Sequence, residues 1–466
     1  MIRAIYKLSV VCLLVDAFCC RAAAQEMAVR VIPQPQEVTL FDAQFTFNPN
    51  SKIVLGQGSS QAESFIVSQL NDRIKELGQT PLPVLQENEV SHWSNVVYFA
   101  NLKQSKKARE MAEKANFSLL MDIGQQGYFL QVSDSLIVVF ANAARGLFYG
   151  CMSLNQMLQG DSHSIRVSGA TIYDWPAFEI RGISDDISHG QISTLADFKR
   201  IIRFLGRYKM NTYLLDLNGA FRFANHPEIS KNRDVLTKEE VTELANYAQR
   251  YYVDLLPVFE TLGHLENILM LPDYRDLAEF PGASAISPAN QQTYKLLDEL
   301  IFELADAFPS PYFHIGGGGG QEIGWGASKR LVEGSGLVAV LASHYNHVYD
   351  IAKSYSKKVL LDSDMISEHP AILSQIPNEI VVVCRPRHAE DSLDEIEFFQ
   401  KAGRTFMVAS DLHTSKRLFP DYAKAFVEMK RRFRKGYEAG ALGAVASSRD
   451  DLSSVAFREY NVYGYA

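Results

Sequence analysis

Cysteine is scarce in this sequence, which has five in 466 residues. Three of them, Cys12, Cys19 and Cys20, fall within the first 25 residues, so only Cys151 and Cys384 belong to the rest of the chain. This excludes a disulfide-rich scaffold. Nothing in the sequence supports a disulfide between the remaining two, and we expect two buried thiols.

Positive charge is also in short supply. The chain has 46 Lys and Arg against 54 Asp and Glu, which gives a net charge of -8. The longest basic run, residues 430–435, is typical of the solvated face of a helix. We therefore expect no nucleic-acid partner.

Apolar runs long enough to span a membrane are absent from the sequence. The run at residues 8–18 follows Arg3 and Lys7 and precedes the small residues of 22–24, a pattern typical of a secretory signal. Cys19 lacks the small preceding residue that a lipid anchor needs. We predict that residues 1–25 are a signal peptide and that the protein is exported to the periplasm or the cell surface.

Two domains are predicted from the hydrophobic pattern of the mature chain. Residues 26–172 mix strand-like and helical stretches without a catalytic constellation, so we interpret them as a smaller supporting α+β domain. Residues 173–466 alternate amphipathic helices with eight short apolar runs: 180–187, 212–217, 254–259, 312–315, 358–361, 380–384, 405–408 and 443–446. Such a series predicts a (β/α)8 TIM barrel, with an open doubly wound sheet as the alternative.

The expected barrel is incomplete at its C-terminal end. The sequence stops at Ala466, and residues 463–465 are a candidate for a last strand. The last helix is therefore expected to be missing, either because the chain is truncated or because something else closes the barrel.

Five consecutive glycines, residues 316–320, mark the end of one expected strand. They follow Phe313-His314-Ile315 and precede Gln321-Glu322. The tip of a barrel strand is where such folds keep their chemistry, yet this tip has no side chains. Because glycine loses the most chain entropy on folding, about 0.5–1 kcal/mol relative to alanine, we expect a flexible tip.

Several motifs together resemble the family 20 glycoside hydrolases, the exo-β-N-acetylhexosaminidases, in the small subgroup with a Gly-His-Leu loop. They are a Pro-Gln-Pro opening, Ala-Arg-Gly-Leu-Phe-Tyr-Gly at residues 144–150, Arg181-Gly182, Phe-Glu-Thr-Leu-Gly-His-Leu at residues 259–265, and His314-Ile315-Gly316. The resemblance covers nearly all of residues 30–466. It implies hydrolysis of terminal N-acetylhexosamines from glycans, with the 2-acetamido oxygen of the sugar as nucleophile.

This sequence departs from the family motif His-x-Gly-x-Asp-Glu. In the family, the Asp orients the acetamido group and the Glu protonates the leaving oxygen. These positions fall on Gly318 and Gly319, and a following Thr falls on Gly320. Both catalytic carboxylates are therefore absent.

At other pocket positions carried over from the family, some residues match the family and others differ. Asp186 and Asp364 match, whereas an Arg that grips the sugar hydroxyls falls on His189. Glu260 and His264 either contact the ligand or hold their loop, and His314 is either a buried hydrogen-bond partner or a base. Aromatic positions of the family fall on Asp362, His413, Ser415 and Arg449.

Two places in the sequence offer groups that could replace the missing carboxylates. Glu322 lies three residues beyond the Glu position and is a weak candidate for a replacement acid. Asp216 with Asp362 or Asp364 forms a second candidate, as a new carboxylate pair or a cation site. We nevertheless predict no metal and no cofactor.

Three functions are compatible with these residues. The first is a family 20 scaffold with an impaired or inactive site, the second an active hexosaminidase with a rearranged acid such as Glu322, and the third a non-catalytic exported glycan-binding protein. In each case the predicted ligand is carbohydrate.

Overall fold

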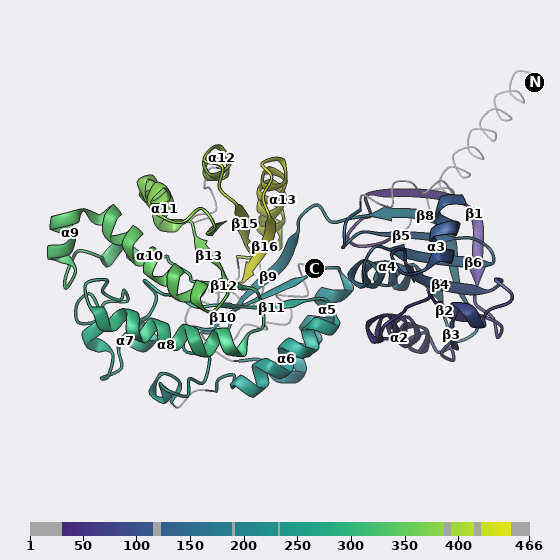
Figure 1. Ribbon diagram of the computed structural model, residues 1–466, viewed down its shortest axis with the longest axis horizontal. Helices are drawn as coiled ribbons and strands as arrows, with labels where there is room; N and C mark the ends of the chain where they lie inside the picture. Colours follow the sequence, from purple (N-terminus) through teal and green to yellow (C-terminus); the bar gives the residue numbers. More distant parts are fainter. Residues whose placement is uncertain are drawn as a thin grey trace, which may run out of the picture. The chain divides into compact units, whose positions relative to one another are not determined.

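The computed structural model describes residues 30–114, 123–188, 192–231, 234–385, 393–413 and 421–448 (Figure 1). Residues 1–25, the predicted signal peptide, lie outside this part. The chain divides into two compact units, Met1–Pro176 and Ala177–Ala466. Among the described residues no helix is long and apolar enough to cross a membrane.

The first unit is a mixed sheet with helices. Its strands run in the order β1-β8-β5-β6-β4-β2-β3, with β7 paired to β8. Strands β2, β3, β4 and β6 pair in parallel, whereas β1, β5 and β8 pair antiparallel. The elements are β1 Glu37–Thr46, β2 Lys52–Leu55, α2 Gln61–Glu76, β3 Val84–Gln86, η2 Glu87–Glu89, β4 Val96–Asn101, α3 Lys106–Lys114, β5 Tyr128–Val132, β6 Leu136–Ala141, α4 Ala144–Met157, β7 Gln159–Gly160 and β8 Ile165–Asp174.

Close packing of α4 explains the glycines of the motif at residues 144–150. A Cβ on Gly146 would lie 2.2 Å from the Gly127 carbonyl oxygen, and one on Gly150 would lie 2.5 Å from Val139 Cγ1. Only glycine lets the helix approach the sheet so closely. The motif therefore serves packing in this unit.

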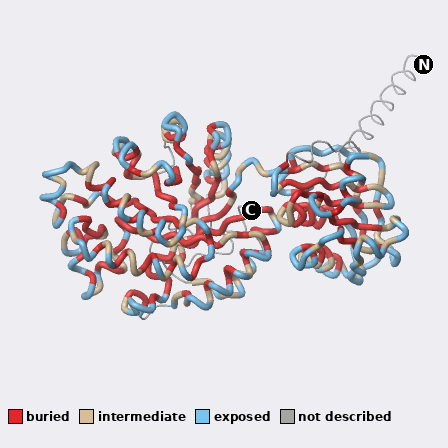
Figure 2. Tube along the Cα trace, viewed as in Figure 1, coloured by how far each residue is buried: buried red, intermediate tan, exposed pale blue. Residues whose placement is uncertain are grey.

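The second unit is a closed barrel of eight parallel strands, which confirms the predicted fold and excludes the open sheet. Helices surround the strands in Figure 1, and Figure 2 shows burial concentrated on the strands. The elements are β9 Ile180–Asp186, α5 Leu195–Arg207, β10 Thr212–Asp216, η4 Pro227–Ser230, α6 Lys238–Arg250, β11 Asp254–Val258, α7 Glu266–Leu269, η5 Arg275–Leu277, α8 Gln291–Ala307, β12 Tyr312–His314, η6 Gly320–Glu322, α9 Lys329–Ser335, α10 Leu337–Ser354, β13 Lys358–Asp362, α11 Asp364–Glu368, η7 Pro370–Gln375, β14 Val381–Cys384, α12 Asp394–Lys401, β15 Phe406–Asp411, α13 Tyr422–Glu438 and β16 Gly443–Ser448.

Strand β16 is the eighth strand, and its pairing with β9, in which Val445 lies opposite Gly182, closes the barrel. The interpretation of residues 463–465 as a last strand is therefore unnecessary for closure. Those residues, like any helix after Ser448, lie outside the described part of the chain.

Apolar side chains from alternate strand positions fill the barrel interior. Leu214, Leu256, Leu360 and Val381 belong to one buried cluster. Because side chains two residues apart along a strand point to the same face, Asp216 follows Leu214 and Asp362 follows Leu360 on the inward side. The same pattern that builds the core thus delivers polar groups to the C-terminal mouth.

Two further sequence expectations concern the cysteines, where the prediction is confirmed, and the basic run, where it holds only in part. Cys151 and Cys384 are free and buried, as expected. The basic run at residues 430–435 lies on α13, but Arg432 is buried and donates hydrogen bonds to the carbonyl oxygens of Ala409 (2.9 Å) and Cys384 (3.1 Å).

Barrel closure depends on a close approach at Gly182, which gives a stability prediction. A Cβ there would lie 2.2 Å from the Thr212 carbonyl oxygen, so Gly182→Ala should lower the free energy of unfolding by about 1–3 kcal/mol. Gly334→Ala is the matched control: it lies in α9 with no atom within 4 Å of the added methyl, and should be neutral or stabilising by up to about 1 kcal/mol. Urea unfolding measures both, and equal midpoints would contradict the packing argument.

Candidate active site

A cavity of about 180 Å³ opens at the C-terminal ends of the barrel strands. Parallel strands bring their carboxyl ends to one mouth, so residues distant in sequence converge there. Every described residue that lines the cavity is polar or glycine, and none is aromatic apart from histidine. They are Ser184, Asp186, Asp216, Asn218, Glu260, His264, Glu266, Gly318, Asp362, Asp364, Arg385, Ser447 and Ser448.

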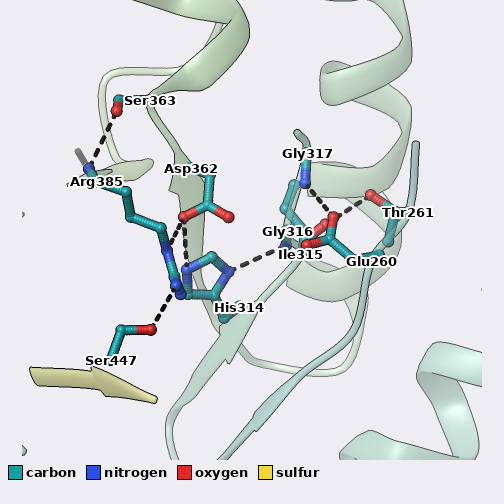
Figure 3. Close-up of polar contacts among 10 residues, drawn as sticks. All are labelled: Glu260, Thr261, His314, Ile315, Gly316, Gly317, Asp362, Ser363, Arg385 and Ser447. Carbon is teal, nitrogen blue, oxygen red and sulfur yellow. Dashed lines mark hydrogen bonds and ion pairs between the residues drawn. The ribbon is translucent and has the colours of Figure 1, made fainter. Parts of the chain in front are cut away.

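Arg385 and Asp362 form a buried ion pair on one wall (Figure 3). Arg385 Nε donates to Asp362 Oδ1 at 2.5 Å, and its Nη1 donates to Ser447 Oγ at 3.1 Å. The charge-assisted bond and the buried location fix the guanidinium across β13, β14 and β16. Although burial opposes its charge, the neighbouring carboxylates raise the pKa of Arg385, with Asp362 the largest of them.

His314 lies beneath this pair and is fully buried. Its Nδ1 accepts a hydrogen bond from the Gly316 amide at 3.0 Å, so the ring proton sits on Nε2, which is 3.4 Å from Asp362 Oδ1. His314 is not among the residues that line the cavity. Of the two roles we considered, the structure places it as a buried hydrogen-bond partner.

Glu260 is held between two barrel loops. Its backbone amide donates to Asn218 Oδ1 at 2.8 Å, and its Oε2 accepts from the Gly317 amide at 3.1 Å (Figure 3). A Cβ on Gly316 would lie 2.0 Å from Oε2. Burial, and then the carboxylates of Asp362 and Asp216, raise the pKa of Glu260 well above its ordinary value.

The glycine run is hydrogen bonded along its length, which differs from the flexible tip that the composition suggests. The Gly316 carbonyl accepts from the Asp362 amide (2.8 Å), the Gly317 carbonyl from the Tyr345 hydroxyl (2.7 Å), and the Gly318 carbonyl from the Gly263 amide (3.1 Å). Gly316, Gly317 and Gly319 have φ of 60°, 96° and 69°. These left-handed values favour glycine, so the run serves the backbone path.

Asp364 and His264 border Gly318 and Gly319, the two glycines predicted to replace the carboxylates of the family. A Cβ on Gly318 would lie 3.0 Å from Asp364 Oδ2 and 3.9 Å from His264 Nε2. A Cβ on Gly319 would lie 3.1 Å from the His264 ring and 3.0 Å from Gly263 Cα. The loop after β11 therefore occupies the space beside Gly318 and Gly319.

Glu322, the candidate substitute acid, points into a neighbouring loop. Its Oε2 accepts hydrogen bonds from the backbone amides of Ser284 and Ala285, both at 2.8 Å, and from Ser284 Oγ at 3.1 Å. It does not line the described cavity, and neither does Gly319. Three bonds to one oxygen give this carboxylate a structural role.

The structure thus brings Asp186, Glu260, His264, Gly318 and Asp364 together, while His189 lies outside the described residues. The candidate carboxylates Asp216, Asp362 and Asp364 also share this cavity. Within the described part of the chain no group of three or more Asp, Glu, His or Cys has a metal-binding arrangement.

Several lining residues were not predicted as ligand contacts. The inward alternation on β9 and β16 would have indicated Ser184 and Ser447, and Arg385 directly follows β14. These residues are Ser184, Asn218, Glu266, Arg385, Ser447 and Ser448.

Comparison with known families identifies the scaffold. The model described as "Glycosyl hydrolase family 20, domain 2" matches residues 28–175, and that described as "Glycosyl hydrolase family 20, catalytic domain" matches residues 178–388. The chain belongs to glycoside hydrolase family 20.

Curated relatives and solved structures carry hexosaminidase names. A beta-hexosaminidase of Porphyromonas gingivalis is 23% identical over 348 residues, which are 66% of this chain and 42% of that protein. The human beta-hexosaminidase subunit beta is 26% identical over 211 residues, which are 41% of this chain and 37% of that protein. The chain thus spans less than half the length of either relative.

Among solved structures, the β-N-acetylhexosaminidase of Bacteroides fragilis is 18% identical, with a TM-score of 0.70 over 93% of this chain and 87% of that chain. The family 20 β-N-acetylhexosaminidase of Streptomyces coelicolor is 17% identical, with a TM-score of 0.71 over 94% and 92%. At this identity the likeness establishes the fold alone.

Glu260 gives a pH prediction. Because the pKa of its carboxyl is raised from an ordinary value near 4.5, the folded state holds this proton more tightly than the unfolded chain. Its contribution to stability is therefore fully present below about pH 4.5 and is lost as pH rises towards the raised value. Glu260→Gln removes this titration, so between pH 5 and 8 the wild type should lose stability relative to the variant by on the order of 1 kcal/mol or more. Urea unfolding at several pH values measures this, and parallel stability curves would refute it.

Proposed function

We propose that the barrel cavity binds a terminal N-acetylhexosamine of a glycan and that hydrolysis there is strongly impaired. The observation that carries this proposal is Gly318, which lines the cavity at the position of the family's acetamido-orienting Asp. Family membership and the retained Asp186 and Asp364 support recognition of the sugar. Export to the periplasm or cell surface, and a carbohydrate partner in place of nucleic acid, are part of the same proposal.

The size of the impairment follows from the two missing roles. A positioned general acid contributes about 10²–10⁴ in rate, and each preorganised electrostatic group contributes about 10²–10³. Losing both costs on the order of 5–9 kcal/mol of barrier. The cavity wall adds a further loss, because pyranose rings normally stack on aromatic side chains and the described lining offers none.

Two alternatives remain from the sequence. An active enzyme that uses Glu322 is disfavoured, because three hydrogen bonds hold that carboxylate oxygen against Ser284 and Ala285. A non-catalytic glycan-binding protein shares the cavity but need not retain the acetamido site. Affinity for the thiazoline of N-acetylglucosamine, which mimics the bicyclic intermediate, separates this last alternative from our proposal.

We expect the purified protein to bind the sugar analogue but to hydrolyse the substrate only slowly. Calorimetry with the N-acetylglucosamine thiazoline should give a Kd of about micromolar order. With an aryl N-acetyl-β-glucosaminide, kcat/KM should be at least about 10⁴-fold below that of a family 20 enzyme with both carboxylates, because two rate-determining groups are absent. Lack of thiazoline binding would falsify the proposed function, and turnover equal to the comparison enzyme would refute the impairment.

Replacing the two carboxylates should restore only part of the rate. A Cβ on Gly318 would lie 3.0 Å from Asp364 Oδ2, the movable end of a side chain, so Gly318→Asp should fold after a small shift of that carboxylate. Gly319→Glu should cost about 1–2 kcal/mol of stability, because φ is 69° and Gly263 Cα lies 3.0 Å from the new Cβ. The double variant should recover about 10²-fold in kcat/KM and no more. Near-complete recovery would show that the surrounding wall matters less than we argue.

A further inference from the structure

The His264 ring stands where the missing acid would project. The ring is 3.1 Å from the Cβ position of Gly319 and its Nε2 is 3.9 Å from that of Gly318. This placement is fixed by backbone contact, since the Gly263 amide donates to the Gly318 carbonyl and a Cβ on Gly263 would lie 2.4–2.6 Å from Gly319. The two loops are therefore packed against each other, with the imidazole at their junction.

The imidazole is available for proton transfer. His264 lines the cavity and is exposed, and within the described residues its ring makes no hydrogen bond or ion pair. Its φ of 57° is uncommon for a residue with a side chain. Such conformations are retained mainly where surrounding structure imposes them, often at functional sites.

Asp364 supplies a carboxylate beside the same slot, by which we mean the space at the Cβ positions of Gly318 and Gly319. Its Oδ2 lies 3.0 Å from the Cβ position of Gly318, the residue that replaces the acetamido-orienting Asp. An oxygen of Asp364 and a nitrogen of His264 are thus both within 4 Å of one point in the cavity wall. A carboxylate and a proton-bearing ring together reproduce the two chemical roles of the erased pair.

We propose that His264 is the proton donor, and Asp364 the acetamido-facing carboxylate, for slow cleavage in this cavity; this rests on the proposed function. The acetamido oxygen attacks C1, and the bond from C1 to the leaving oxygen breaks with its electron pair. That oxygen takes the proton from His264 Nε2, while Asp364 stabilises the oxazolinium that forms. Water then attacks C1, the bond from C1 to the acetamido oxygen breaks, and His264 takes the proton from water.

Other acids near the slot are less well placed. Glu260 Oε2 is bound to the Gly317 amide and seated against Gly316, two residues before the slot. Glu322 faces Ser284 and Ala285. Histidine is also the side chain that most often acts as a general acid or base near neutral pH.

The test compares leaving groups with the full chain and His264→Asn. Asn is chosen because it tolerates left-handed backbone. A phenyl N-acetyl-β-glucosaminide needs its leaving oxygen protonated, whereas the 2,4-dinitrophenyl analogue does not. We expect the variant to lose about 10²-fold or more in kcat on the phenyl substrate and less than about threefold on the dinitrophenyl substrate. His163→Asn, at an exposed histidine of the first unit, should match wild type on both substrates.

Each result decides between the two proposals. Asp364→Asn should slow both substrates equally and weaken thiazoline binding, since its carboxylate acts on the acetamido group in either case. Three outcomes would overturn the role of His264. The His264→Asn variant loses kcat equally on both substrates, it loses kcat on neither, or the wild type shows no turnover. Thiazoline binding in the same samples shows whether the proposed function stands, so an intact pocket with no His264 dependence refutes only the present inference.

Discussion

The Glu260 carboxylate lies in the space that a side chain at residue 316 would need. This contact constrains the backbone at the mouth of the barrel. With Oε2 2.0 Å from the would-be Cβ and a φ of 60°, residue 316 favours glycine. The same oxygen binds the Gly317 amide, which joins the loop after β11 to the end of β12. The contact between Gly263 and Gly319 joins the same two segments a second time. The position of His264 in the cavity is therefore a consequence of backbone packing.

Charge in the cavity is organised by the same alternation that fills the core. Asp216 and Asp362 lie on the inward side, two residues beyond buried leucines of β10 and β13. Burying several carboxylates together is unfavourable unless a partner compensates them. Arg385 supplies that partner for Asp362, whereas burial and the neighbouring carboxylates raise the pKa of Glu260. The result is a polar wall suited to hydroxyl and amide groups.

The sequence was sufficient for the barrel because short apolar runs and amphipathic helices alternate regularly. Asp186 and Asp364 were expected from the family resemblance, and Glu260 and His264 from their loop; all four line the cavity because they lie at or beyond the C-terminal end of a strand. It was insufficient where a side-chain contact joins two strands. Arg385 pairs with Asp362 on the neighbouring strand, 23 residues away in the sequence. Glu322 is near the acid position in sequence, but capture by Ser284 and Ala285 turns it away, and no local pattern predicts that capture.

The backbone conformation of the glycine run distinguishes two cases. Either the site is an ordinary family site with two side chains removed, or its loop follows a different path. Gly319 has a left-handed φ and lies against Gly263, so a Glu there would have to displace backbone as well as the His264 ring. A loop that carries a glutamate at residue 319 would not favour that conformation, because left-handed backbone is costly for glutamate. The backbone path of this loop therefore favours glycine at residue 319. In that path the side chains nearest the Cβ positions of Gly318 and Gly319 are the His264 imidazole and the Asp364 carboxylate, the two groups to which we assign the chemistry in our proposal.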